Sequence, residues 1–473
     1  MRLTQIFSVS FLLLYSTLSW AYAPLELLPD GNRASLLVEK LDNSPLLTTH
    51  NNDKYFPPAS TLKVVTALAA KLELDENFRF ETRLEKVGKN WVIRFSGDPT
   101  LSTKDLKQML AKARKKGLKQ INGDIWLDNS AFNGYNRAVG WPWDILGVCY
   151  SAPATAVTLD GNCVHASIYT EQEGKTRVYV PEHFPIYAST TVKSVTKTEQ
   201  ESSQCDLQLT SSPDNHYQLY GCLVERKKPL PLKFAVQDPE LYTQRMLHTV
   251  LRQVGITLKG NIKVGSLIAT DSQLLASHQS DRLDVLLEEM LKQSDNLIAD
   301  NLTKTLGRTF FHQPGSFNNG TSAIKQIIFT HTGIDLEAFP LADGSGLSRN
   351  NRFSSEKMAD ILHYIWNNDK TLNLVSLLPT AGESGTLKYR RSMRKEPVTG
   401  AIVGKSGSLY GSYNMAGYGL DGSGKPNSVF VQFVTDYFPE KPRADATPVV
   451  APITHFETLF YQDVVKFSQM PAN

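Results

Sequence analysis

The sequence predicts an α+β protein in which one sheet is shared by the two ends of the chain and the middle is an insertion. Residues 34–49 alternate as two short strands around Asp42-Asn43-Ser44-Pro45, which is a hairpin signal. Strand-like segments recur near the C-terminus, at residues 401–403, 413–420 and 428–437. A helical pattern over residues 450–467 closes the chain. From about residue 79 the texture changes to short strands and turns, which favours a separate inserted part.

The elements between these ends follow in order. Pro57 and Pro58 set the entry of a buried helix that runs through the apolar residues 64–70 and ends near Leu74. The inserted part is expected to hold strands at 80–87, 91–96, 125–127 and 261–267, helices at 104–116 and 238–254, and a strand-rich stretch at 159–224. Apolar residues from Leu283 to Leu291 then recur at i, i+3, i+4, i+7 and i+8, which predicts an amphipathic helix. A second helix continues to Gly307.

The composition is that of an ordinary globular protein. A chain of 473 residues is too long for one compact core and predicts two or three domains. It is 41% hydrophobic and 21% charged with a formal net charge of +3, which indicates neither a nucleic-acid partner nor an acidic tail.

The first residues predict export. Arg2 precedes an apolar run over residues 6–18, and Ala21-Tyr22-Ala23 supplies small residues of the kind found at signal cleavage sites. Cleavage after Ala23 would leave Pro24 first, so residues 1–21 are the expected signal peptide, with cleavage after Ala21. No later stretch approaches the roughly 18 apolar residues needed to span a bilayer. The sequence therefore predicts an exported protein whose membrane association is peripheral at most.

The four cysteines predict disulfides rather than a metal site. They lie at Cys149, Cys163, Cys205 and Cys222, and no Cys-x-x-Cys pair occurs. Of the three connectivities we favour sequential pairing, Cys149–Cys163 and Cys205–Cys222.

Ser60 and Lys63 form the first candidate for chemistry. Their spacing places both side chains on one face of a helix, within one turn. A serine hydroxyl needs a base beside it, and a lysine serves if burial or neighbouring cations lower its pKa. At a helix N-terminus, free N–H groups would favour a developing negative charge. A helix-capping role for Ser60 is the plain alternative.

The same spacing recurs elsewhere, so the motif alone is weak. The other matches are Ser194/Lys197, Ser322/Lys325, Ser354/Lys357 and Ser392/Lys395. Ser194 lies in a strand-like stretch, and Ser354 and Ser392 have charged surroundings typical of surfaces. Ser322 is expected to open a helix and is the one serious competitor.

Two further motifs follow downstream. Ser294-Asp295-Asn296 lies at a junction between helices, where a hydroxyl can relay a proton and a carboxamide can hold a substrate amide. Lys405-Ser406-Gly407 follows the strand at 401–403 and offers a cation, a hydroxyl donor and a glycine that permits close approach of substrate.

In this order the three motifs resemble the signature of penicillin-binding proteins and serine β-lactamases. Longer segments resemble the penicillin-binding protein 4 family, the D-alanyl-D-alanine carboxypeptidase/endopeptidases of class C. These segments are 56–70, 97–101, 140–143, 232–238 and 342–349. The resemblance implies a β-lactamase/transpeptidase-like domain, an antiparallel sheet flanked by helices, with two inserted smaller, strand-rich domains. The implied bounds are 22–78 with 265–473, 79–165 with 226–264, and 166–225.

The resemblance also implies roles for individual residues. Ser60 would be the acylated nucleophile, Lys63 its base, and Ser294 the group that passes the proton to the leaving amine. Substrate would be held by Asn296 at the acyl-side amide and by Lys405 and Ser406 at the terminal carboxylate, with Gly407 allowing close approach. The N–H groups of Ser60 and Ser408 would form the oxyanion hole. Arg349 is a weaker supporting candidate.

Three departures from the family pattern concern substrate contacts. Ser406 replaces a threonine but keeps the hydroxyl. Tyr410 stands where relatives often have glutamine, at the rim of the site. The family places an acidic residue just after Trp-Pro-Trp, where it meets the amino group of diaminopimelate. Here Asp144 follows Trp143 directly and Ile145 holds the next position, so Asp144 is a weaker candidate.

The resemblance thus implies a serine DD-peptidase without cofactor or metal, which acts on peptidoglycan stem peptides and cross-links and is acylated by β-lactam antibiotics. A serine β-lactamase and a non-catalytic peptidoglycan-binding protein are the alternatives; the long insertions favour the peptidase over a lactamase. The sequence leaves the oligomeric state open, and a homodimer is compatible with it. A phosphate-binding loop at 400–406 is rejected because three residues, not four, separate its glycines.

Overall fold

The computed structural model describes residues 22–42, 46–267, 271–440 and 450–471. The predicted signal peptide and its cleavage site after Ala21 lie outside the described residues, as does most of the turn predicted at 42–45. No helix in the described part of the chain is long and apolar enough to cross a membrane.

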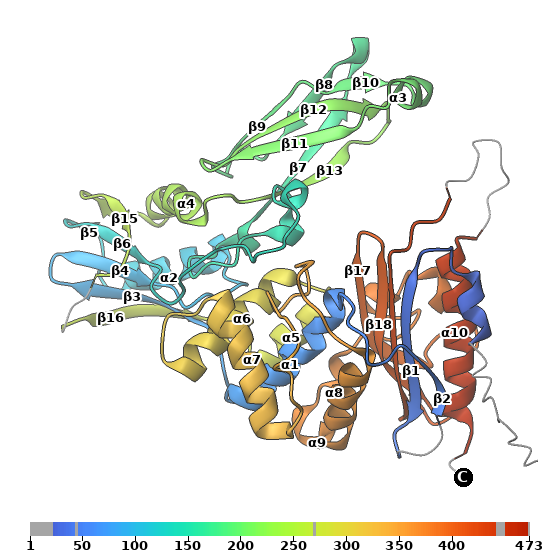
Figure 1. The fold of residues 1–473 in the computed structure, drawn as a ribbon. Helices are drawn as coiled ribbons and strands as arrows, with labels where there is room; N and C mark the ends of the chain where they lie inside the picture. Colours follow the sequence, from blue (N-terminus) through green and yellow to red (C-terminus); the bar gives the residue numbers. More distant parts are fainter. Residues whose placement is uncertain (1–21, 43–45, 268–270, 441–449, 472–473) are drawn as a thin grey trace, which may run out of the picture.

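The two ends of the chain share one antiparallel sheet, as predicted. Its order is β17-β18-β19-β1-β2, so the first strands of the chain lie beside the last (Figure 1). The strands are β1 (Arg33–Lys40), β2 (Leu46–His50), β17 (Ile402–Leu409), β18 (Ser412–Leu420) and β19 (Pro426–Thr435). All four pairings are antiparallel, and β1 lies against β19 over its whole length.

Helices cover both faces of this sheet (Figure 1). On one face lie α10 (Pro452–Gln469) and the 3₁₀ helix η1 (Ala23–Leu27). The helical layer on the other face holds α1 (Leu62–Glu73), α5 (Leu283–Lys292), α6 (Asn296–Phe311), α7 (Phe317–Thr332), α8 (Ser355–Asn367) and the short α9 (Asp369–Leu372). Alternation along β19 explains the two layers. Val431 and Phe433 join the core of α1, α5, α6 and α8, whereas Phe430 and Val434 join the core beneath α10.

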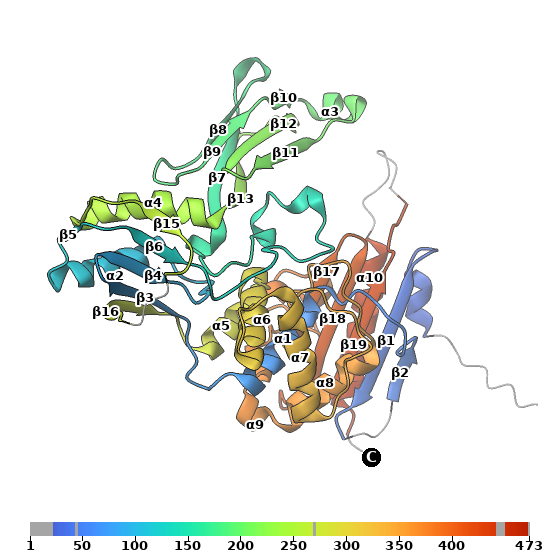
Figure 2. The ribbon, with the colours of Figure 1, turned by 60° about the vertical axis from the view of Figure 1, so that its left-hand side comes forward.

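A second sheet forms the nearer part of the insertion. Its order is β15-β6-β4-β3-β16, with α2 and α4 beside it (Figure 2). The bounds are β3 (Glu81–Val87), β4 (Asn90–Arg94), α2 (Thr103–Lys115), β6 (Ile125–Asp128), α4 (Pro239–Val254), β15 (Ile262–Val264) and β16 (Gln273–Gln279). A small pair joins β5 (Gln120–Ile121) to β14 (Thr257–Leu258).

Strand β16 corrects one predicted boundary. The implied domain bounds assign residues 265–473 to the catalytic part, but β16 pairs with β3 in the sheet of the insertion. Its sequence, Gln-Leu-Leu-Ala-Ser-His-Gln, has no alternation that would reveal a strand. The other predicted bounds remain a prediction.

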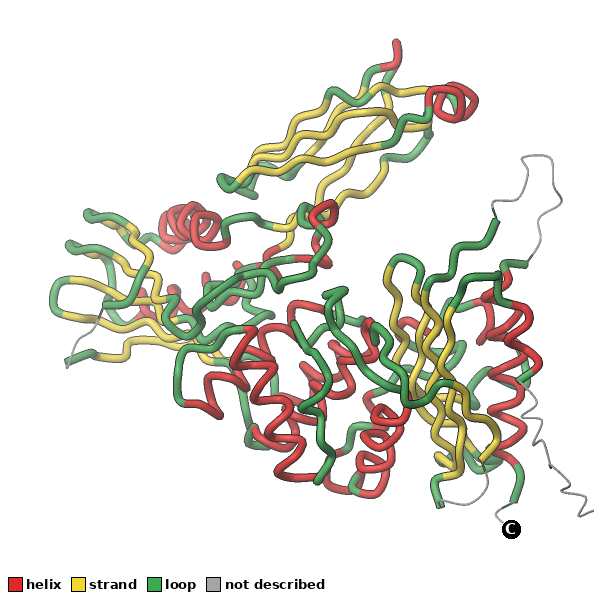
Figure 3. Tube along the Cα trace, in the orientation of Figure 1, coloured by secondary structure: helices red, strands yellow, loops and turns green. Residues whose placement is uncertain are grey.

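The farther part of the insertion is an arm of two small sheets (Figure 3). One has the order β13-β7-β8, and in the other β12 lies between β10 and β11 and also pairs with β9. The bounds are β7 (Cys163–Thr170), β8 (Thr176–Tyr179), β9 (Tyr187–Thr190), β10 (Lys193–Val195), α3 (Lys197–Ser203), β11 (Leu207–Ser212), β12 (His216–Val224) and β13 (Leu230–Ala235). The arm shares one apolar core with the nearer sheet, because Tyr217 and Phe234 belong to the same cluster as Ile93.

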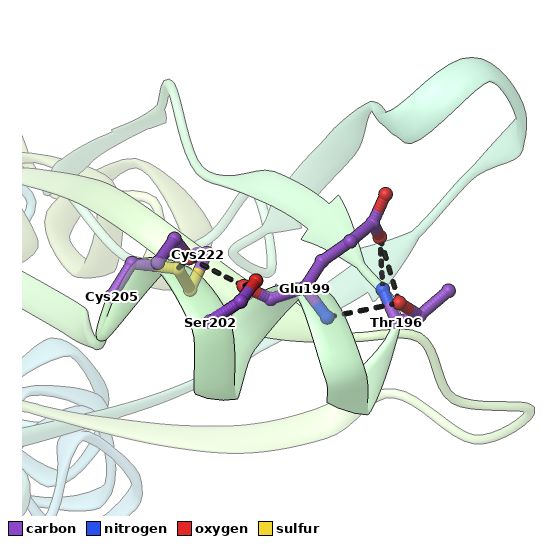
Figure 4. Close-up of a disulfide and its surroundings, with 6 residues drawn as sticks. Thr196, Glu199, Ser202, Cys205 and Cys222 are labelled. Atoms are coloured by element: carbon purple, nitrogen blue, oxygen red, sulfur yellow. Dashed lines mark hydrogen bonds between the residues drawn. A yellow bond between two sulfur atoms is a disulfide. The ribbon is translucent and has the colours of Figure 1, made fainter.

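The predicted disulfides are both confirmed. Cys149 is bonded to Cys163 and Cys205 to Cys222. The second bond links Cys205, just after the end of α3, to Cys222 in β12. The first turn of α3 is fixed by a reciprocal cap, in which the side chains of Thr196 and Glu199 each accept the other's backbone N–H (Figure 4).

The competing Ser-x-x-Lys pairs take other structural roles. Ser194 lies in strand β10, as predicted. Ser322 does not open a helix, since α7 begins at Phe317 and is capped by Ser316. Two expectations of surface exposure are wrong: Ser354 is buried as the N-cap of α8, and Ser392 is buried where it donates to Glu457.

Candidate active site

Ser60 lies where the chain enters the helical layer. It is the middle residue of the 3₁₀ turn η2 (Ala59–Thr61), which leads directly into α1. Lys63 Nζ donates to Ser60 Oγ over 3.0 Å, so the predicted nucleophile and base are in contact. The Lys63 side chain is fully buried, whereas Ser60 is partly accessible. A hydroxyl in contact with a buried amine is an arrangement that can activate the oxygen as a nucleophile.

Lys63 is held by two further acceptors. Its Nζ donates to Asn296 Oδ1 over 2.6 Å and to the Ser345 carbonyl over 2.7 Å. Burial lowers the pKa of Lys63 to about 8, although the carboxylates of Asp300, Asp343 and Asp295 act in the opposite direction. The amine can therefore lose its proton near neutral pH.

The carboxylates near Lys63 organise a loop rather than pair with the amine. Asp300, one turn beyond Asn296 on α6, accepts the N–H groups of Gly344 and Ser345 over 3.1 and 3.0 Å. The carboxylate of Asp343 accepts hydrogen bonds from Trp141 Nε1 over 2.8 Å and from the Ser348 N–H over 2.7 Å. These bonds fix the carbonyl of Ser345 that faces Lys63.

Ser294 and Lys405 form the second contact of the site. Ser294 connects α5 to α6 in the left-handed region, with a φ of 59°. Lys405 Nζ donates to Ser294 Oγ over 2.9 Å and to the Ser406 carbonyl over 2.8 Å. Burial, followed by the cations Lys63 and Arg390, holds the pKa of Lys405 well below its usual range. Among the described residues no acidic side chain forms a salt bridge with Lys405, so a bound anionic group would supply its counter-charge.

Strand β17 carries the third motif past Ser60. The strand extends through Leu409, farther than predicted, and includes Lys405, Ser406 and Gly407. Ser406 Oγ lies 2.8 Å from Thr386 Oγ1. A Cβ at Gly407 would lie 2.9 Å from the Pro58 oxygen and from the Ser60 and Thr61 nitrogens, which explains the glycine. Ser408, the next residue, is exposed.

The weaker candidates lie at the rim. The Arg349 guanidinium lies 6.0 Å from the centre of the Tyr410 ring, and Tyr410 is 78% exposed. Asp144 is exposed; burial, and after it the charge of Asp144, raises the pKa of Tyr150. The Tyr150 carbonyl accepts Asn296 Nδ2 over 2.7 Å. Asp144 thus borders the site, although no hydrogen bond in the described part of the chain joins it to Ser60, Lys63 or Ser294.

Sequence reasoning missed several residues that hold the site together. Asp300, Asp343, Ser345 and Thr386 contact or fix predicted groups. The sequence could have indicated some of these residues. Asp300 follows Asn296 by one helical turn, and Asp343 and Ser345 lie in the segment 342–349, which resembles the family but was assigned no role for these two residues. Thr386 has no motif around it. The described residues contain no group of three or more His, Cys, Asp or Glu side chains placed to hold a metal.

Comparison with known proteins gives a family match over most of the chain. Residues 24–454 match the D-Ala-D-Ala carboxypeptidase 3 (S13) family. The chain is 36% identical over 450 residues to the D-alanyl-D-alanine carboxypeptidase DacB of Haemophilus influenzae, covering 93% of this chain and 92% of that protein. It is 27% identical over 410 residues to the D-alanyl-D-alanine carboxypeptidase of Actinomadura sp., covering 82% and 75% of the two chains.

Solved structures agree with these matches. The crystal structure of penicillin binding protein 4 from H. influenzae superposes with a TM-score of 0.86 at 34% identity, covering 94% of this chain and 98% of that one. A second structure of that protein, in complex with a β-lactam, gives a TM-score of 0.81 at 33% identity over 95% and 99% of the two chains. The α+β fold predicted from the sequence, with its β-lactamase/transpeptidase-like domain, is therefore confirmed.

Proposed function

The chain belongs to the D-Ala-D-Ala carboxypeptidase 3 (S13) family, and from this premise we propose that it is a periplasmic serine DD-peptidase with Ser60 as nucleophile. Its substrates are peptidoglycan stem peptides that end in D-Ala-D-Ala and cross-links between D-alanine and diaminopimelate. Carboxypeptidase and endopeptidase activity then share one site and one acyl-enzyme.

The first half of the reaction forms the ester. Ser60 Oγ attacks the D-alanyl carbonyl, and its proton passes to the neutral amine of Lys63, which lies 3.0 Å away. The carbonyl oxygen takes the negative charge and is stabilised by the N–H groups of Ser60 and Ser408. The C–N bond then breaks: Ser294 gives its hydroxyl proton to the leaving amine and is reprotonated by the proton that Lys63 took from Ser60, so that Lys63 is neutral again. In the second half, water attacks the ester, which releases the shortened stem peptide and restores the Ser60 hydroxyl.

The carboxylate of the leaving group is assigned to Lys405 and Ser406. The Lys405 amine is buried and has no acidic partner in the part of the chain that the structure describes, and the hydroxyl of Ser406 lies 2.8 Å from that of Thr386. A carboxylate in this position would accept hydrogen bonds from both residues and would raise the lowered pKa of Lys405. Asn296 is assigned to the acyl-side amide, and Asp144, Arg349 and Tyr410 are assigned to the rim of the same substrate.

The observation that carries the proposal is the contact between Ser60 and the buried Lys63. The test is an intact mass spectrum after brief exposure to benzylpenicillin, with peptide mapping, on the wild type and on S60A. A persistent single adduct on Ser60, absent from S60A, would support the peptidase. Rapid loss of the adduct with consumption of the drug would indicate a β-lactamase instead. Absence of any adduct would contradict the nucleophile assignment.

A further inference from the structure

A cluster of exposed cations lies immediately beyond the residue that contacts Ser406. Residues 388–395, here called the basic segment, include four exposed cations, Lys388, Arg391, Arg394 and Lys395. Within the described part of the chain none of the four forms a salt bridge. The Lys388 amine lies 5.6 Å from the centre of the Tyr389 ring, which is itself 73% exposed. The exposed acids nearest in sequence are Glu383 and Glu396, so positive charge predominates.

The basic segment is anchored by the residues that lie between or beside its exposed cations. Leu387 and Met393 are buried in the core beneath α10. Between them Arg390 donates a hydrogen bond from its Nε to Glu457 on α10 over 3.1 Å, and the Ser392 hydroxyl donates to the same carboxylate over 2.8 Å. The segment is therefore anchored to the catalytic part of the molecule.

The basic segment is also close to the carboxylate end of the proposed site. Thr386 Oγ1 lies 2.8 Å from Ser406 Oγ, and the Cα of Lys388 can be at most about 7 Å from that of Thr386. The charge of Arg390 reaches the site as well, since it helps to hold the pKa of Lys405 below its usual range. A leaving group that extends from Ser406 past Thr386 would therefore approach the basic segment, in which Lys388 and Arg391 are the exposed cations nearest to Thr386 in sequence.

We propose that the basic segment binds the leaving stem peptide of cross-linked substrates through that peptide's carboxylates. This inference rests on the proposed function. When the leaving group is a single D-alanine, its one carboxylate is used at Lys405 and Ser406, and nothing extends to the segment. When a cross-link is cut, the leaving group is a whole stem peptide, whose acidic residues carry further carboxylates. The segment then favours cross-links over monomeric stems as substrates.

The experiment compares two substrates that share the acyl side and differ only in the leaving group. These are a stem peptide ending in D-Ala-D-Ala and a dimer cross-linked through D-alanine. K388Q/R391Q is compared with the wild type and with K112Q/K115Q, which removes two exposed cations from α2. K388R/R391K keeps both charges.

We expect K388Q/R391Q to lower kcat/KM for the dimer about threefold to tenfold, mainly through KM, since exposed ion pairs are individually weak. Turnover of the monomer and acylation by benzylpenicillin should stay within twofold of wild type. K112Q/K115Q and K388R/R391K should match the wild type on both substrates. Raising the salt concentration from about 50 to about 500 mM should erase the difference between wild type and K388Q/R391Q.

Other results would overturn the inference. An equal loss on both substrates would mean that the cations act on the site as a whole. If K388Q/R391Q keeps the wild-type kcat/KM on both substrates but sediments less with vesicles of anionic lipid, the basic segment binds a membrane surface instead. If the wild type is acylated by benzylpenicillin but cuts no dimer, the inference about the basic segment is wrong, while the proposed acylation of Ser60 still holds. A wild type that is not acylated and cuts neither substrate would contradict the proposed function itself.

Discussion

The amine of Lys63 is buried among three carboxylates, and burial outweighs them, so its pKa falls from 10.5 to about 8. Because the neutral amine is the form that can accept the Ser60 proton, the acylation rate should rise with pH through about 8. At pH 7 about a tenth of the sites hold the neutral form, and at pH 9 about nine tenths. Stopped-flow acylation by a chromogenic β-lactam across pH 6–10 would measure this limb. A flat profile would show that Lys63 does not act as the base.

Removal of Lys63 provides a second test at this scale. K63A should fold, because its neighbours Asn296 and Ser345 keep other contacts, but it should acylate at least about a hundredfold more slowly. The control is the melting temperature, which should confirm a folded protein. Retained acylation by a folded K63A would exclude the base role.

Asp300 affects the same amine through the backbone. D300A would leave the buried N–H groups of Gly344 and Ser345 without an acceptor, which costs about 1–3 kcal/mol for each group. We expect a lower free energy of unfolding and slower acylation, because the carbonyl of Ser345 is then held less firmly. D300N keeps the accepting oxygen, so its free energy of unfolding should lie near that of the wild type. Chemical denaturation measures the first effect, and equal losses in D300A and D300N would contradict the assignment.

At the scale of elements, strand β17 approaches the turn η2 closely at Gly407. G407A would place a Cβ 2.9 Å from three backbone atoms at Pro58, Ser60 and Thr61, so the strand and the turn must separate. We expect a loss of about 1–3 kcal/mol in the free energy of unfolding and a tenfold or larger fall in the acylation rate. Gly422 provides the matched control G422A, because a Cβ added there would meet no atom within 4 Å.

The sequence predicts most reliably those helices and strands that have a regular spacing of apolar residues or a recognisable motif. The amphipathic helix from Leu283 and the helix after Ser60 lie where they were predicted, because one buried face fixes their pattern. Strand β16 was missed because its burial follows no alternation. The same limit holds in the site: Asp300 and Thr386 act by tertiary contact with Gly344 and Ser406, and no short-range pattern records such contacts.

At the scale of the whole molecule, the arm shares its core with the nearer sheet of the insertion and not with the catalytic helices. The disulfide between Cys205 and Cys222 closes a sequence separation of 17 residues, and loss of a bond of this kind costs about 2–5 kcal/mol. In C205S/C222S, amide exchange should therefore quicken in β9–β12, β7 and β13 while α1 and β17 stay protected. Acylation by benzylpenicillin should be unchanged, and an acylation rate that falls with arm protection would show that the two parts are coupled.

The pairing of β1 with β19 has a consequence for how the protein is made. Arg33 lies opposite Thr435, so β1 cannot pair with β19 until residues near 435 have been synthesised. At ribosomal rates of about 5–20 residues per second, the partner emerges roughly 20–80 seconds later. A nascent chain released early would carry Ser60 on a helix but no sheet to hold it. The site around Ser60 can therefore form only after synthesis is nearly complete, when β19 pairs with β1 and completes the sheet.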